Sequence, residues 1–276
     1  MKEPNSYQIN KIAIDVDKEI KRLQAQVELF WPKEIKHYIE FGLADGMVVG
    51  EFGSGPGFVT DKLLSLFPSL QVKSVELDAL LANYASDFLT ERYGSRVEVI
   101  EGSILEIPME ENSIDIAITR LVLEHLKDPE QAVKEVYRVL KPGGRALFID
   151  NDFEMHIMTY PHIPELRKLY EAYCIARIDE GGKPKIGREL PMVLYQAGFE
   201  KIDFEVISAH SSILGDEMFF KSEGIGIPSK LVKDGYLPSK TLGEISRKWS
   251  RMIKDEKHSI IRQLYMAVGE KSPQKE

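Results

Sequence analysis

The fold of this chain is decided by the stretch Met47-Val48-Val49-Gly50-Glu51-Phe52-Gly53-Ser54-Gly55-Pro56-Gly57. An apolar run ends there in an acidic residue and three glycines at alternate positions, and a helical pattern begins at Phe58. This order predicts a buried strand, a tight glycine turn and a helix start. In that geometry, backbone N–H groups and the helix N-terminus face a ligand.

Strand and helix patterns alternate on the carboxyl side of this turn. Short apolar segments predict further strands at 72–76, 97–100, 114–118 and 146–149. Helices are expected from Phe58 to the residue before Pro68, at 80–93 and after Asp128, which is followed by Pro129 and Gln131 in a capping pattern. Alternation at these lengths predicts an α/β fold, in which helices cover both faces of a mostly parallel sheet.

Four regions of the chain are expected to differ in role. Residues 1–44 are expected to form helices that pack on or cap the core, with Pro32 interrupting the first helical stripe. Residues 45–152 are expected to form the ligand-binding core, and 153–270 the remainder of the fold with lid insertions. The tail 271–276 is expected to be disordered.

The region 153–270 has a less regular pattern than the core. We expect a loop over 151–164, a strand at 204–207 and a charged helix near 241–255. The final strand is expected at 260–268. Residues 211–240 are expected to form an insertion that contains glycines and prolines.

Charge and composition restrict the function classes. The formal net charge is −8, which disfavours a general binder of nucleic acid or acidic membranes, although a local basic patch is compatible with it. Cys174 is the single cysteine, so no intrachain disulfide can form. The sequence shows neither a signal peptide nor a run long enough to span a membrane, and a cytoplasmic monomer or homodimer is expected.

The spacing of the glycines favours one kind of nucleotide ligand over another. Phe58 stands where the third glycine of a dinucleotide fingerprint would fall, which counts against a nicotinamide oxidoreductase. Glu76 ends the next expected strand, where an acidic side chain accepts hydrogen bonds from ribose hydroxyls. The pattern therefore indicates a nucleoside ligand without a pyrophosphate.

Over residues 45–152 the sequence resembles the class I S-adenosylmethionine-dependent methyltransferases, especially the small-molecule type similar to ubiquinone- and menaquinone-biosynthesis methyltransferases. The resemblance rests on five motifs in the family's order. They are the acidic glycine motif at 51–57, Val75-Glu76-Leu77-Asp78, Gly102-Ser103-Ile104-Leu105-Glu106-Ile107-Pro108, 113–126, and Leu140-Lys141-Pro142-Gly143-Gly144. The resemblance implies a Rossmann-like, seven-stranded sheet with an antiparallel C-terminal strand.

The resemblance also implies a set of cofactor contacts. S-adenosyl-L-methionine, whose product is S-adenosyl-L-homocysteine, would lie against Glu51, Gly53, Ser54, Gly55, Glu76, Leu77, Ser103, Ile104 and Arg120. Gln26 on the first helix could reach the cofactor's carboxylate. Ser103 stands where the family usually has Asp, so its contact with the adenine amino group would be uncharged. Alternatively, Glu51 has a structural role, in which its carboxylate accepts hydrogen bonds from N–H groups of the turn.

Methyl transfer from a sulfonium requires positioning and exclusion of water more than a particular catalytic group. The candidates for a general base are His125, Asp152 and His156, which follow the fourth and fifth expected strands. A histidine that only stabilises a loop is the competing interpretation of His125. The spacing of these residues matches no strong metal signature, so no metal is expected.

These patterns predict a methyltransferase that acts on the O, N, S or C atom of a small molecule. The alternatives are a protein or RNA methyltransferase and a non-catalytic cofactor-binding partner subunit. The acidic balance and the insertions at 151–190 and 211–240 favour a small, enclosed acceptor and no nucleic-acid partner. A basic rim around the pocket would favour a macromolecule instead.

Overall fold

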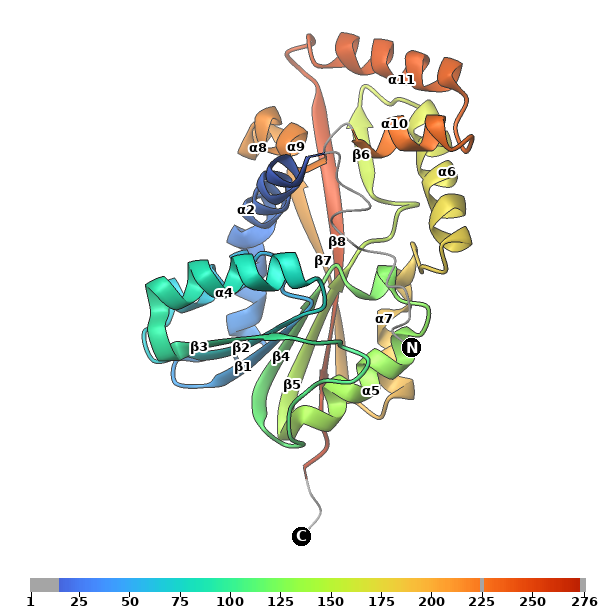
Figure 1. Ribbon diagram of the computed structural model, residues 1–276. Helices are drawn as coiled ribbons and strands as arrows, with labels where there is room; N and C mark the ends of the chain where they lie inside the picture. Colours follow the sequence, from blue (N-terminus) through green and yellow to red (C-terminus); the bar gives the residue numbers. More distant parts are fainter. Residues whose placement is uncertain (1–14, 224–225, 274–276) are drawn as a thin grey trace.

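The computed structural model describes residues 15–223 and 226–273. Five parallel strands form the centre of one sheet, in the order β3-β2-β1-β4-β5, and β8 continues it beside β5 (Figure 1). The parallel strands are β1 (Val48–Phe52), β2 (Gln71–Glu76), β3 (Val97–Glu101), β4 (Ile114–Arg120) and β5 (Leu140–Asp150). The predicted mostly parallel α/β fold is therefore confirmed.

Three strands run antiparallel to their neighbours and differ in part from the expectation. β8 (Ser259–Glu270) pairs with β5, and both β6 (Ile157–Tyr160) and β7 (Glu200–His210) pair with β8. Within the described residues the sheet has eight strands where seven were expected, because part of the predicted loop at 151–164 forms β6. Only four residues of β6 pair, with alternating half-buried and exposed side chains, so the apolar signal is weak.

Helices cover both faces of this sheet. One hydrophobic cluster includes side chains of α2 (Val16–Glu40), α3 (Phe58–Leu66) and α4 (Ala79–Tyr93). A second includes side chains of α5 (Pro129–Val139) and α7 (Ile186–Gln196). The short 3₁₀ turns η1 (Gly94–Arg96) and η2 (Leu123–His125) join neighbouring elements.

The predicted break at Pro32 is wrong, because α2 continues through it from Val16 to Glu40. Proline lacks the N–H that would bond to Glu28 and normally disrupts a helix interior. Here Phe30 before it and Tyr38 after it are both buried, so packing holds the two halves in line. Tertiary burial therefore outweighs the local preference of one residue.

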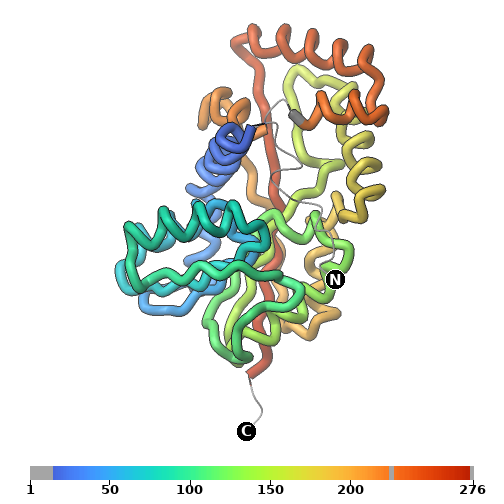
Figure 2. Tube along the Cα trace, in the orientation of Figure 1, coloured from blue at the N-terminus to red at the C-terminus, as the bar shows by residue number. Residues whose placement is uncertain are grey.

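The remaining helices form a lid above the carboxyl ends of the parallel strands (Figure 2). The lid consists of α6 (Glu165–Asp179), α8 (Ser211–Leu214), α9 (Asp216–Glu223), α10 (Gly226–Lys233) and α11 (Ser239–Met252). The charged helix expected at 241–255 is thus α11, and the insertion expected at 211–240 is largely helical where it is described. β8 runs from the lid into the core, pairs with β6 in the lid and pairs with β7 along most of its length.

Two other features of the chain bear on the expectations. No helix within the described residues is long and apolar enough to cross a membrane. The expectation of a disordered tail falls partly on residues 274–276, which lie outside the described residues.

Candidate cofactor and acceptor site

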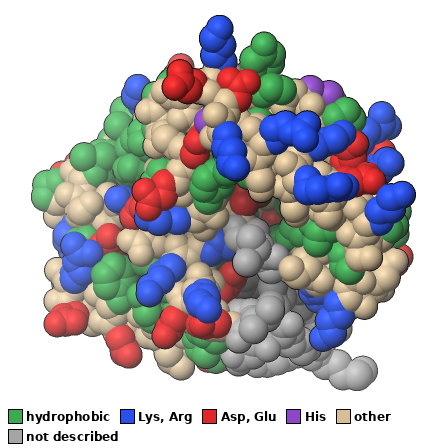
Figure 3. Space-filling model, turned by 90° about the horizontal axis from the view of Figure 1, so that it is seen from above, with side chains coloured by type: hydrophobic (Ala, Val, Ile, Leu, Met, Phe, Trp, Pro, Cys, Tyr) green, Lys and Arg blue, Asp and Glu red, His purple; other side chains and the backbone are tan. Residues whose placement is uncertain are grey.

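A cavity of about 1860 Å³ lies between the carboxyl edge of the sheet and the lid. A space-filling view from above shows the hollow in this face (Figure 3). The volume exceeds the roughly 300–1,000 Å³ of most ligand sites, so two molecules can be held together. Every residue predicted to bind cofactor lines it: Gln26, Glu51, Gly53, Ser54, Gly55, Glu76, Leu77, Ser103, Ile104 and Arg120.

The glycine turn forms the wall of this cavity at the end of β1. Gly53 and Gly55 have φ values of +73° and +55°, in the left-handed region that favours glycine. A Cβ at Gly53 would lie 2.4 Å from Val122 Cγ2, whereas a Cβ at Gly55 would have no atom within 4 Å. Gly53 therefore allows close packing under the turn, and Gly55 faces open space in which a ligand fits.

Glu76 fixes the turn from the neighbouring strand. Its two carboxylate oxygens accept hydrogen bonds from the N–H groups of Gly55 and Asp78, each at 2.8 Å. Burial raises the pKa of Glu76, while these backbone donors oppose the shift. Each carboxylate oxygen has a second lone pair, so both can still accept from ligand hydroxyls.

Glu51 lies deeper and is almost fully buried at 3% exposure. Its carboxylate accepts a hydrogen bond from the Thr60 hydroxyl in α3. Burial raises the pKa of Glu51 to about 7, and the bond from Thr60 only partly opposes this. Glu51 is thus held by a side chain of α3, and its position on the cavity wall also leaves it available to a cationic ligand group.

Two other predicted cofactor residues have local partners. The Ser103 hydroxyl accepts a hydrogen bond from the Leu105 N–H at 3.1 Å and keeps a proton to donate. Arg120 donates through Nε to both carboxylate oxygens of Glu34 at 3.0 Å and through Nη2 to the Gln26 carbonyl at 3.1 Å. Because Glu34 is fully buried, this pair fixes α2 against the end of β4.

The candidate general bases are placed differently from one another. His125 and His156 line the cavity, whereas Asp152 does not. The Asp152 carboxylate instead pairs with Arg188 on α7 and accepts from the Glu154 N–H at 3.1 Å. A buried carboxylate that already has these partners stabilises the loop after β5.

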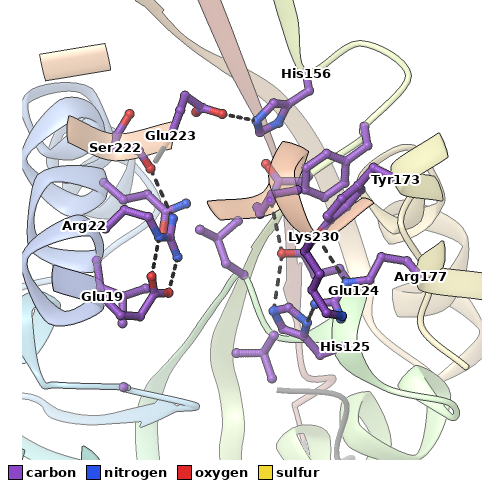
Figure 4. A pocket seen from close by; sticks show the side chains of 18 of the residues that line it. Glu19, Arg22, Glu124, His125, His156, Tyr173, Arg177, Ser222, Glu223 and Lys230 are labelled. Carbon is purple, nitrogen blue, oxygen red and sulfur yellow. Dashed lines mark hydrogen bonds and ion pairs between the residues drawn. The ribbon is translucent and has the colours of Figure 1, made fainter. Parts of the chain in front are cut away.

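His125 is close to Arg177 of α6, with 2.6 Å between Nδ1 and the guanidinium Nη2 (Figure 4). Burial and the nearby guanidinium groups of Arg177 and Arg22 hold the pKa of His125 well below its usual value. A neutral ring accepts through Nδ1 and carries its proton on Nε2, which lies 3.5 Å from Glu124 Oε1. The Nδ1 lone pair is therefore engaged by Arg177.

His156 belongs to a second cluster, higher in the cavity. Its Nε2 lies 3.1 Å from Glu223 Oε2, and Glu223 also pairs with Arg262 at 2.9 Å. The His156 ring stacks on Phe153 with centroids 4.5 Å apart. Burial lowers the pKa of His156, whereas the charge of Arg262 and the contact with His156 lower that of Glu223 to about 2.

Sequence reasoning missed several charged residues that the lid brings to this cavity. They are Arg177, Glu180, Glu223 and Arg262, which come from α6, α9 and β8. In Figure 4, Arg22 with its partner Glu19 faces His125 and Arg177 across the pocket. No local pattern marks these residues, because their proximity depends on how the lid packs. The described residues contain no group of three His, Cys, Asp or Glu placed to hold a metal.

Comparisons with known proteins identify the domain that contains the glycine turn. Residues 50–148 match the sequence model of a methyltransferase domain. An uncharacterized 37.1 kDa protein in a Streptomyces fradiae transposon is 40% identical over 103 residues, 37% of this chain and 29% of that protein. The ubiquinone/menaquinone biosynthesis C-methyltransferase of Hahella chejuensis is 27% identical over 139 residues, 50% of this chain and 53% of that enzyme. The chain thus spans about half, or less, of the length of these relatives.

A solved structure shares the fold. The S-adenosylmethionine-dependent methyltransferase from Aquifex aeolicus superposes with a TM-score of 0.53 at 24% identity, covering 71% of this chain and 94% of that one. The fold, the order of the motifs and the matched segment agree. Residues 50–148 therefore match a methyltransferase domain within a Rossmann-like fold, and the chain is similar to S-adenosylmethionine-dependent methyltransferases.

Proposed function

We propose that this protein transfers a methyl group from S-adenosyl-L-methionine to a small-molecule acceptor with a largely apolar body. One observation carries the proposal: a single cavity joins the glycine turn and Glu76 to an aromatic and aliphatic lid. The lid side chains that line it are Leu166, Leu169, Tyr170, Tyr173, Phe219, Leu231, Leu242, Ile245 and Trp249. The C-methyltransferase activity of the Hahella relative is compatible with such an acceptor.

The residues at the sheet edge fit the cofactor. Gly55 leaves open space above the turn, Glu76 has acceptor capacity for two ribose hydroxyls, and Glu51 is placed for a cationic group. When bound, the cofactor supplies a methyl group on a positively charged sulfur, which leaves as a neutral thioether. The lid then holds the acceptor atom in line with the bond between the methyl carbon and the sulfur, and it excludes water.

The acceptor's chemistry determines whether a base is needed. A carbon or neutral nitrogen nucleophile needs no deprotonation before attack, whereas a hydroxyl or thiol gives up a proton as its new bond forms. His125 and His156 are the cavity-lining candidates for that proton. His156 pairs through Nε2 with Glu223, so its Nδ1 is the nitrogen with acceptor capacity.

The charge of the lining favours a small acceptor over RNA. Among the described residues, acidic and basic side chains line the cavity in about equal numbers, so the lining as a whole is not basic. A polyanion needs a concentrated basic surface at the place where it is modified. The enclosed, apolar upper half is suited to a compact, apolar molecule.

Isothermal titration calorimetry tests the cofactor assignment. We expect S-adenosyl-L-methionine and S-adenosyl-L-homocysteine to bind with one site per chain, and a nicotinamide dinucleotide not to bind. Absence of binding by both sulfur nucleosides would overturn the proposal. The acceptor is then sought by transfer of an isotope-labelled methyl group to apolar and to aqueous metabolite extracts, with label expected in the apolar fraction.

A further inference from the structure

The outer face of α11 carries a row of cations that form no ion pairs with residues of the described part of the chain. Lys240, Arg247 and Arg251 are exposed and recur at spacings of seven and four residues, which places them on one face of the helix. None of the three forms a salt bridge with a described residue, although Arg247 donates to the Gly243 carbonyl at 3.3 Å. This outward face is called the α11 cationic face below.

The opposite face of α11 is apolar and faces the cavity. Leu242, Ile245 and Trp249 line the cavity, and Met252 is buried. The helix is therefore amphipathic, with its apolar side already covered by the lid. α11 lies at the end of the molecule farthest from the parallel sheet (Figure 1).

The charge of this segment is opposite to that of the rest of the chain. Residues 226–254 contain seven Lys or Arg against Asp234 and Glu244, a formal charge of +5 in a chain of net charge −8. Lys233 and Lys254 are also exposed and without a salt bridge to a described residue. Figure 3 shows Lys and Arg side chains grouped beside the hollow, on the face seen from above.

Exposed apolar side chains lie beside the same end of the cavity. Phe220 of α9 is 42% exposed, and its ring lies 6.3 Å from that of Trp249. Ile227 of α10 is 38% exposed, and it lines the cavity together with Phe220. Both side chains thus lie on the cavity side of the lid, whereas the cations of α11 face outward. The cations by themselves attract an anionic membrane surface.

We propose that the α11 cationic face docks on an anionic membrane surface. This places the mouth of the apolar cavity next to the phase in which an apolar acceptor dissolves. The inference about the acceptor rests on the proposed function, whereas docking itself does not.

The observations favour a membrane over a nucleic acid. Single-stranded nucleic acids bind where aromatic side chains interleave with cations, but Trp249 lies on the opposite, cavity-facing side of α11. The strongly acidic remainder of the chain would also repel a polyanion that extends past the lid. A planar membrane can meet α11 at the end of the molecule without approaching the acidic core.

Vesicle sedimentation without cofactor or acceptor tests the docking. The full chain is mixed with vesicles of phosphatidylcholine alone or of phosphatidylcholine with phosphatidylglycerol, at low salt and at 0.5 M salt (on the order of a 4 Å screening length). We expect binding to the anionic vesicles only, and release at high salt. Equal binding to both vesicle types, or binding to neither, would overturn the proposal.

Two matched triple variants locate the surface. In one, Lys240→Gln, Arg247→Gln and Arg251→Gln remove the α11 cationic face. In the other, Lys36→Gln, Lys62→Gln and Lys134→Gln remove three cations that form no salt bridge with a described residue and lie on α2, α3 and α5. The first should weaken partitioning by about a hundredfold, at roughly fivefold per cation, and the second by much less.

Other outcomes have defined meanings. Equal losses in the two triple variants would show that only total charge matters and would reject α11 as the docking face. Binding of a single-stranded RNA probe in preference to anionic vesicles would assign the face to nucleic acid instead. Thermal unfolding at an unchanged temperature confirms that the variants are folded. Cofactor binding is read separately by calorimetry, so failure of docking and failure of the proposed function are distinguishable.

Discussion

The carboxylate of Glu76 accepts a hydrogen bond from the N–H of Gly55 at 2.8 Å, across the gap between β2 and the turn after β1. Its second oxygen accepts from the Asp78 N–H at the same distance. The acid thus stabilises the shape of the glycine turn and also presents acceptors to the cavity. Binding and local order depend on one side chain.

Glu76→Ala should weaken binding of S-adenosyl-L-homocysteine by about 1–3 kcal/mol, because charged acceptors for hydroxyl groups are lost and the Gly55 N–H is left unpaired. Calorimetry measures the change. Glu98→Ala on the next strand, where the side chain is exposed, is the control and should leave the affinity unaltered. An unchanged affinity in Glu76→Ala would remove Glu76 from the site.

Gly53→Ala and Gly55→Ala should differ in stability, although both glycines have positive φ. Alanine at 53 would place Cβ 2.4 Å from Val122 Cγ2, so we expect a loss of about 2–4 kcal/mol from strain and overpacking. Alanine at 55 meets no atom within 4 Å and should cost about 1 kcal/mol. Urea unfolding measures both values.

A second substitution identifies the cause of the larger loss. Gly53→Ala combined with Val122→Ala should recover about 1 kcal/mol relative to the sum of the single changes, because the clash is relieved. Strict additivity of the two changes would attribute the loss to backbone strain alone.

The pKa of Glu51 predicts a pH-dependent difference in stability between the wild-type protein and Glu51→Gln. Burial raises this pKa from 4.5 to about 7, so the folded state holds the proton more tightly than the unfolded state. The folded protein then loses stability as pH rises from about 4.5 to 7. The loss reaches the order of 3 kcal/mol.

Glutamine at position 51 does not titrate. Its free energy of unfolding, relative to wild type, should therefore rise between pH 5 and pH 8, as measured by urea unfolding at each pH. Other groups titrate in both proteins, so the difference isolates Glu51. A difference that stays constant over this range would contradict the raised pKa.

His125 predicts the opposite dependence. Its folded pKa is held well below the usual 6.5, so the folded state binds fewer protons, and stability is lost as pH falls below 6.5. His125→Gln should reduce this loss while keeping an acceptor for Arg177. His125→Ala should cost about 1–3 kcal/mol at pH 8, because the buried Arg177 guanidinium loses its acceptor.

Histidine at position 210 provides the comparison, since it is half-exposed and lies outside the cavity. His210→Gln should leave the loss of stability below pH 6.5 unchanged. If His125→Gln and His210→Gln alter this loss of stability equally, the burial of His125 is not its cause.

The cofactor half of the molecule was predictable because its signals are local. The strand, turn and helix around 47–66 follow one another in sequence, and the parallel strand order then brings Glu76 and Ser103 to the same edge. All ten predicted cofactor residues accordingly line one cavity. What was predicted there depended on short-range order and on one rule of sheet topology.

The lid was less predictable because its structure depends on contacts far apart in sequence. Pro32 was expected to end a helix that burial maintains, and the four paired residues of β6 were read as loop. Asp152 follows β5 as expected, but Arg188 holds its carboxylate away from the cavity. The pairing of Arg262 with Glu223 requires β8 and α9 to be packed together, which no short pattern encodes.

The long strand β8 has a practical consequence for changing acceptor preference. One part of it pairs with β5 in the core, while an earlier part pairs with β6 in the lid. A lid exchanged between homologues must therefore retain the register of β8, since a shift of one residue would turn Arg262 from one face of the sheet to the other. Libraries that vary 211–257 and keep 259–270 constant are the more promising route to new substrates.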